Sequence, residues 1–170
     1  VRCWALALVM TGLGGSVVAA DGAEWSTPND PAYRRYPADP HQENLFLLEM
    51  ENAWKLEKGS PKLVLGVIDW AFDAEHPDLK NQLWTNPGEI AGNGQDDDGN
   101  GLVDDVHGWD FVDNDPTLAG TQSEHGNHVA GILAAQANNA EGIAGMAPGC
   151  RLLLVKVGAP GTLRDGAMTA

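Results

Sequence analysis

Two stretches of the chain are predominantly apolar over the length of a β-strand. They are residues 63–68, which lead directly into Asp69, and residues 152–157. Apolar runs of this length are typical of strands that are buried in a parallel sheet. Between them, residues 123–136 carry apolar side chains with helical potential. The order strand, helix, strand predicts a βαβ unit, and therefore an α/β fold with a parallel sheet and flanking helices.

The remaining segments show weaker patterns. Residues 44–56 place apolar side chains on one face of a helix, which the Gly-Ser-Pro sequence at 59–61 would end. Residues 21–43 are rich in proline and polar residues, which predicts an extended N-terminal arm. Residues 86–120 contain clusters of glycine, asparagine and aspartate and are expected to form a long loop. No strong strand pattern follows residue 158, so we expect the chain to stop partway through its domain, after the second or third core strand.

The first 20 residues have the pattern of a secretory signal peptide. Arg2 is the only charged residue before Asp21, and the apolar stretch between them ends in small residues at 18–20, where cleavage would occur. The alternative is a membrane anchor. Removal of the signal peptide would leave a secreted, extracellular chain whose only cysteine is Cys150, so no internal disulfide can form.

The charge of the chain excludes several classes of partner. It has 10 basic and 24 acidic residues, a net charge of −14, and loss of Arg2 with the signal peptide makes this 9 against 24, or −15. This acidic excess argues against nucleic acid and against anionic membrane surfaces, both of which need a basic footprint. No apolar run of 18 residues lies beyond residue 20, so we expect no membrane contact after signal cleavage. We also expect a monomer.

Two candidate catalytic side chains stand at the ends of the predicted elements. Asp69 follows the first strand, and open α/β sheets bind ligands at the carboxyl ends of their strands. The alternative is an aspartate that caps a turn. His125 lies at the helix start, where the helix dipole disfavours imidazolium and favours a neutral base. His125 and His128 could instead share a metal or form a structural pair, although no glutamate lies between them as in the two-histidine zinc motif.

Four segments of the chain together resemble a known family. Residues 64–79 read VLGVIDWAFDAEHPDL, residues 125–131 read HGNHVAG, and residues 138–157 read NNAEGIAGMAPGCRLLLVKV. In this order they resemble the aspartate segment, the histidine segment and the following segment of subtilisin-like serine proteases. Residues 86–116 are similar to an acidic insertion found in many secreted members of that family. The resemblance covers roughly residues 28–160.

The resemblance implies a subtilisin-like fold over residues 44–170 and peptide-bond hydrolysis by an Asp-His-Ser triad. His125 would then be the general base and later the general acid, and Asp69 would orient its imidazole. The expected partner is a protein or peptide substrate. The nucleophile is not found in the chain: its serines, Ser16, Ser26, Ser60 and Ser123, all lie outside the Gly-Thr-Ser-Met-Ala context of the family. We therefore predict that this chain alone does not hydrolyse peptides.

Two departures from the family pattern lie beside the candidate catalytic residues. The family usually has Asp-Thr-Gly where this chain has Asp69-Trp70-Ala71, and His-Gly-Thr-His where it has Asn127. Two hypotheses follow. The chain is the N-terminal part of a secreted subtilisin-like endopeptidase, or it is a non-catalytic, calcium-binding secreted pseudoprotease module.

A calcium site is predicted within the acidic segment, because its sequence resembles the first positions of an EF-hand loop. Calcium prefers several oxygen ligands on a tightly turned backbone. The candidate ligands are Asp96, Asp98, Asn100, the carbonyl of Leu102, and Asp104. No lysine or arginine occurs between Lys80 and Arg151, so the carboxylates repel one another unless they bind a cation or stay solvated. A solvated acidic loop is the alternative.

The resemblance alone implies a second calcium site. Members of the family often hold calcium between an N-terminal Gln, the Asp of a His-Pro-Asp-Leu segment and an Asn-rich loop after the histidine helix. Gln42, Asp78 and Asn139 match those positions, and carbonyls near residues 137, 141 and 143 would complete the site.

Overall fold

The computed structural model describes residues 7–9, 27–34 and 42–158. Its elements are β1 (Ala7–Val9), α1 (Pro31–Arg34), α2 (Glu43–Leu47), α3 (Met50–Leu56), β2 (Val64–Asp69), the 3-10 helix η1 (Lys80–Gln82), β3 (Gly108–Asp110), α4 (Ser123–Ala134) and β4 (Arg151–Lys156). The strands form one sheet in the order β1-β2-β4-β3, in which β2, β4 and β3 run parallel. The predicted α/β fold with a parallel sheet is confirmed.

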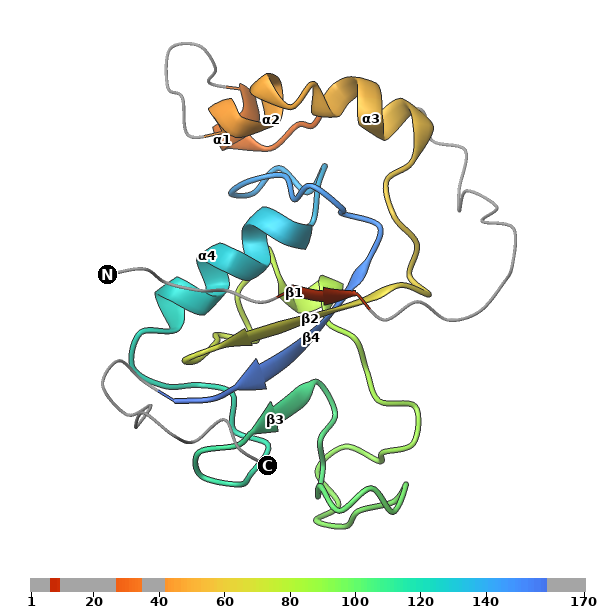
Figure 1. Ribbon diagram of the computed structural model, residues 1–170, viewed down its shortest axis with the longest axis vertical. Coiled ribbons are helices and arrows are strands. Elements are labelled where there is room, and N and C mark those ends of the chain that lie inside the picture. The colour runs from red at the N-terminus through yellow and green to blue at the C-terminus, as the bar shows by residue number, and fades with distance from the viewer. Residues whose placement is uncertain (1–6, 10–26, 35–41, 159–170) are drawn as a thin grey trace.

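The main core lies between the sheet and α4, which contacts β2 and β4 (Figure 1). Alternate residues of β4, Leu152 and Leu154, are 0% and 1% exposed, as expected for a strand covered by a helix. The other buried members of this cluster are Val67, Phe72, Leu79, Leu83, Leu118, Ala130 and Ala134. This packing fixes α4, and with it His125, relative to the end of β2.

A second, smaller core joins the N-terminal helices to the loop after α4. In Figure 1, α1, α2 and α3 lie together beyond that loop. Tyr33, Leu45, Trp54 and Ala144 are buried there, and the ring of Tyr33 stacks on Phe46 at a centroid distance of 4.8 Å. The indole nitrogen of Trp54 donates to the carbonyl of Met146 over 2.9 Å. These contacts hold together two segments that are about 90 residues apart in sequence.

Three sequence predictions need correction. The helix expected at 44–56 is two helices, α2 and α3, because Glu49 between them adopts a left-handed φ of 52°. The arm expected to be extended contains α1 in its described part, and Pro31 suits the first turn of that helix because its ring presets φ. The loop expected at 86–120 contains the buried strand β3. The strands β2 and β4 begin and end one residue from the predicted bounds.

β1 pairs antiparallel with β2, with Leu8 opposite Gly66. Its three residues fall inside the predicted signal peptide, and the rest of that range lies outside the described residues. The signal peptide therefore stays a prediction. Among the described residues, no helix combines the length and apolar character that a membrane crossing requires.

Gly126 allows α4 to approach the loop after β2. A Cβ atom at this position would lie 2.2 Å from the carbonyl oxygen of Ala71 and 2.9 Å from the ring of Phe72. The first of these is a backbone atom, which cannot move without shifting the loop. A residue larger than glycine would therefore push the helix away from the sheet.

We expect Gly126→Ala to lower the free energy of unfolding by about 1–3 kcal/mol, as overpacked core sites do, although alanine favours a helix by roughly 1 kcal/mol over glycine. Urea denaturation measures the change. Gly131→Ala is the matched control on the same helix, because its Cβ would meet only the flexible side chain of Ile143, at 3.2 Å. Equal stability of the two variants would contradict the prediction.

Candidate active site

The carboxyl ends of the three parallel strands bring polar side chains to one edge of the sheet. Asp69 of β2 and Asp110 of β3 are both in register with Lys156 of β4. Asp69 and Asp110 are 6% and 0% exposed, so their carboxylates need partners. Asp69 is hydrogen-bonded to His125, and Asp110 forms an ion pair with Lys156.

Asp69 and His125 form a hydrogen-bonded pair. Nδ1 of His125 lies 2.9 Å from each carboxylate oxygen of Asp69, although the residues are 56 positions apart in the chain. The His125 side chain is 34% exposed. A carboxylate at Nδ1 favours the tautomer with the proton on that nitrogen, which leaves Nε2 able to accept one. The structure thus brings together the two residues that the sequence predicted as a catalytic pair.

The two departures from the family pattern have defined contacts beside this pair. The backbone amide of Trp70 donates to Oδ1 of Asp69 over 2.7 Å, and its indole lies 4.8 Å from the His125 ring between centroids. Oδ1 of Asn127 accepts a hydrogen bond from the amide of Asp73 over 2.9 Å, which ties α4 to the loop after β2. Neither side chain interrupts the contact between Asp69 and His125.

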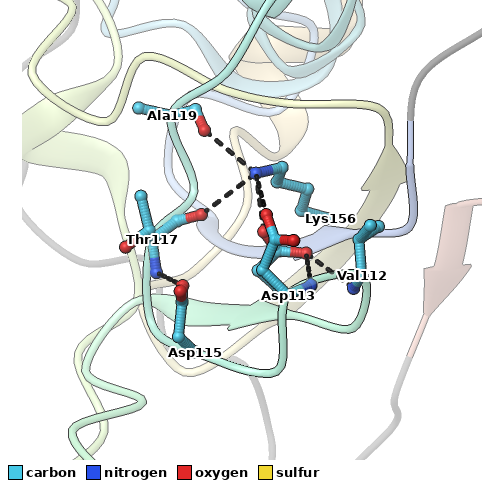
Figure 2. Close-up of polar contacts among 7 residues, drawn as sticks. Val112, Asp113, Asp115, Thr117, Ala119 and Lys156 are labelled. Carbon is cyan, nitrogen blue, oxygen red and sulfur yellow. Dashed lines mark hydrogen bonds and ion pairs between the residues drawn. The ribbon is translucent and has the colours of Figure 1, made fainter.

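Lys156 anchors the loop that leads from β3 to α4 (Figure 2). Its ammonium lies 2.6 Å from Oδ2 of Asp110 and donates to the carbonyl of Ala119 over 3.0 Å and to that of Thr117 over 3.4 Å. The same loop is hydrogen-bonded to the loop after β2, because the carbonyl of Leu118 accepts from the amide of Phe72. This lysine therefore fixes the segment that precedes the helix of His125.

The carboxyl group of Asp110 is held ionised. Burial alone raises its pKa, but the hydrogen bond from Lys156 and those from the amides of Val112 and Asp113 more than offset this and hold the pKa below its usual range. Sequence reasoning did not predict this ion pair. A usable signal was present, because Lys156 is a charged residue at the end of an otherwise apolar strand.

Part of the predicted acidic calcium site comes together. One carboxylate oxygen from each of Glu89, Asp96 and Asp98 lies within 4.8 Å of the other two. Asp96 accepts the amides of Gly99, Asn100 and Gly101, and these hydrogen bonds lower its pKa. Glu89 was not predicted, because it lies seven residues before Asp96 and outside the EF-hand pattern.

The other residues predicted for this loop have different contacts. The carboxylate of Asp104 accepts the amides of Gly92, Asn93 and Gly94. The amide nitrogen of Asn100 donates to Asp98 over 3.2 Å, and its oxygen accepts the backbone amide of Leu102 over 2.7 Å. The carboxylate cluster thus contains Asp96 and Asp98 but not Asp104.

The second predicted set is also partly assembled. Asn139 donates to Oδ1 of Asp78 over 2.8 Å, and the amide of Ile143 donates to Oδ2 over 2.9 Å. The amide group of Gln42 instead exchanges two hydrogen bonds with the backbone of Ala144, at 2.8 and 2.9 Å. The structure places Asp78 and Asn139 in contact and gives Gln42 another partner.

Asp30 is a buried carboxylate beside this set that sequence reasoning missed. It is 0% exposed; its Oδ2 accepts the amide of Asn138, and its Oδ1 has no partner among the described residues. Burial raises its pKa, and the nearby negative charge of Asp78 raises it further. A buried carboxylate with a free oxygen next to a second carboxylate is the arrangement that a bound cation would relieve.

Comparison with known proteins identifies related sequences. A model of the subtilase family matches residues 60–169. The chain is similar to the thermophilic serine proteinase of Bacillus sp. (strain AK1), 38% identical over 146 residues, which are 84% of this chain and 29% of that protein. It is also similar to thermitase of Thermoactinomyces vulgaris, 34% identical over 131 residues, or 77% of this chain and 37% of that protein.

A third relative matches a shorter stretch. The chain is 42% identical over 93 residues to subtilisin-like protease 1 of Plasmodium berghei (strain Anka), covering 53% of this chain and 15% of that protein. The chain thus spans well under half the length of each of these relatives.

Proposed function

The chain belongs to the subtilase family, and we propose that it supplies the aspartate and the histidine of a secreted serine endopeptidase that cleaves proteins or peptides. The observation that carries the proposal is the pair of 2.9 Å contacts between Nδ1 of His125 and the carboxylate of Asp69. The predicted signal peptide supports secretion, and the acidic net charge of −14 favours a protein substrate over nucleic acid. We propose that the protein acts as a monomer.

In this proposal His125 transfers protons and Asp69 stabilises the charge that results. Nε2 of His125 would take the proton of the attacking serine and later give it to the leaving amine. Asp69, bonded to Nδ1, keeps the ring in the required tautomer and stabilises the imidazolium. Because Asp69 is 6% exposed, water competes little for its carboxylate.

The chain as given is expected to be inactive by itself. Ser123 opens α4 two residues before His125, and none of the four serines of the chain lies in the sequence context of a nucleophile. We expect a purified sample of residues 21–170 to show neither cleavage of a casein substrate nor labelling by a fluorophosphonate that reacts with activated serines. Cleavage that survives removal of contaminating proteases would contradict this expectation.

The protease proposal is tested on the protein as its natural source produces it. We expect fluorophosphonate labelling and casein cleavage, both lost in Asp69→Ala and in His125→Ala. Ser123→Ala is the matched control, since this serine is not expected to take part. A natural protein that is folded yet unlabelled and inactive would favour the alternative, a non-catalytic calcium-binding module.

We also propose that calcium stabilises the fold. The first candidate site is the carboxylate cluster of Glu89, Asp96 and Asp98, and the second lies around Asp30, Asp78 and Asn139. The free buried oxygen of Asp30 fits a cation, because it lacks any other partner among the described residues. Calcium would supply positive charge to carboxylates that otherwise repel one another, and it takes no part in the proposed proton transfers.

A further inference from the structure

Trp70 packs on the imidazole of His125. The ring centroids are 4.8 Å apart and the ring planes are inclined by 32°, within the range of offset aromatic stacking. Trp70 directly follows Asp69, and its backbone amide donates to Oδ1 of that residue over 2.7 Å. One residue therefore contacts both members of the Asp69–His125 pair, through its amide and through its indole ring.

We infer that Trp70 is a positioning residue, which holds the imidazole of His125 against Asp69 and stabilises its protonated form. The inference rests on the proposed function, because it concerns the ring that would carry the proton. The bonds to Asp69 fix Nδ1 but leave the ring able to rock about that nitrogen. An indole in contact with the ring restrains the rocking, and the ring is otherwise partly open to water, with 34% of the His125 side chain exposed.

Trp70 also interacts with the charge that protonation places on the imidazole. The face of an indole attracts a cation within about 6 Å of its centroid. When His125 takes up a proton, its ring becomes a cation next to Trp70, while Asp69 neutralises it from the Nδ1 side. The usual family residue at this position has a small hydroxyl side chain and offers no aromatic surface. Trp70 thus supplies a contact that the family pattern lacks.

The test is a titration of His125 by NMR in the 170-residue chain, with Trp70→Leu and Trp70→Phe. Leucine keeps apolar bulk without an aromatic face, and phenylalanine keeps the face. We expect the pKa of His125 to fall by about half a unit in Trp70→Leu, a roughly threefold weaker affinity for the proton. We expect a smaller fall in Trp70→Phe. A variant His125→Gln assigns the resonance.

The ionisable groups on the elements next to the pair are unchanged in both Trp70 variants. They are Asp69 on β2, Asp73 in the loop that follows, Glu124 and His128 on α4, Asp110 on β3 and Lys156 on β4. A difference between the Trp70 variants therefore reports the indole. A pKa of His125 that rises or stays constant in Trp70→Leu would overturn the inference, because an indole that only shields the ring from water lowers this pKa. An equal fall in Trp70→Phe would also overturn it, because phenylalanine keeps an aromatic face.

Two further measurements separate this inference from the proposed function and from misfolding. In the unaltered chain, cross-relaxation between ring protons of Trp70 and His125 is expected, and its absence overturns the inference whether or not a variant folds. Asp69→Asn tests the pair itself, and a large fall in the pKa of His125 is expected. If Asp69→Asn has this effect but Trp70→Leu has none, the inference fails and the Asp-His pair stands. If Asp69→Asn has no effect, the proposed function fails.

Discussion

Replacing Lys156 with methionine is expected to lower the free energy of unfolding by about 3–5 kcal/mol, the usual cost of leaving one partner of a buried ion pair alone. Methionine keeps most of the apolar stem of lysine but removes the ammonium that lies 2.6 Å from Asp110. Asp110 is 0% exposed, so its carboxylate cannot regain water without opening the loop. Urea denaturation followed by circular dichroism measures the loss.

Two controls distinguish the loss of the buried ion pair from the loss of a charge elsewhere. The double variant Lys156→Met with Asp110→Asn is expected to recover most of the loss, because no uncompensated buried charge remains. Asp113→Asn is expected to cost less than about 1 kcal/mol, since its carboxylate is 4.0 Å from the ammonium and its side chain is 68% exposed. A Lys156→Met variant as stable as the original chain would contradict the prediction.

The stability contributed by the Asp110–Lys156 pair depends on pH. The pKa of Asp110 is lower in the folded state than its ordinary value of 3.8. A carboxyl group with a lowered pKa stabilises the fold fully above its unfolded pKa, and this stabilisation is lost as the pH falls through the folded value. The difference between the original chain and Lys156→Met should therefore be full at neutral pH and shrink below about pH 4.

The parts of the fold that the sequence predicted are those with strong local patterns. The strands β2 and β4 are recognisable because residues 64–68 and 152–155 within them are consecutively apolar, as is typical of strands in a parallel sheet. The strand β3 has only three residues, Gly108–Asp110, too few for any periodicity to show within a glycine-rich and aspartate-rich segment. The break at Glu49 was not predictable, because nothing in that residue type demands a left-handed φ.

The same contrast applies to the candidate site. Asp69 and His125 were found because each stands at the end of a recognisable element. Asp30 was missed because its partner Asn138 is 108 positions away, and only the folded chain shows that its carboxylate is buried. The sequence marks Trp70 and Asn127 only as departures from the family pattern, whereas the fold shows that Trp70 packs on His125 and that Asn127 accepts from the amide of Asp73. A single-sequence pattern identifies an unusual residue but does not reveal what that residue contacts.

Calcium is expected to raise the melting temperature of the chain relative to a chelator, and Asp30→Asn is expected to abolish most of that rise. A ligand that binds only the folded state adds about 4 kcal/mol at 1,000 times its Kd. For a domain of this size that is roughly 8–16 °C. Differential scanning calorimetry with calcium or chelator measures it. Asp96→Asn, in the acidic loop, is the matched control that separates the two candidate sites.

A second expectation concerns the stability of the chain without calcium. Burial and the charge of Asp78 raise the pKa of Asp30 in the folded state. Without calcium, the contribution of Asp30 to stability is therefore full below its unfolded pKa and is lost as the pH rises through its folded value. Above its folded pKa the ionised Asp30 opposes folding unless a cation neutralises it. Asp30→Asn should thus melt no lower than the original chain in chelator, yet gain little from calcium. A variant that melts lower in chelator and keeps the full calcium increment would show that Asp30 is an ordinary structural carboxylate.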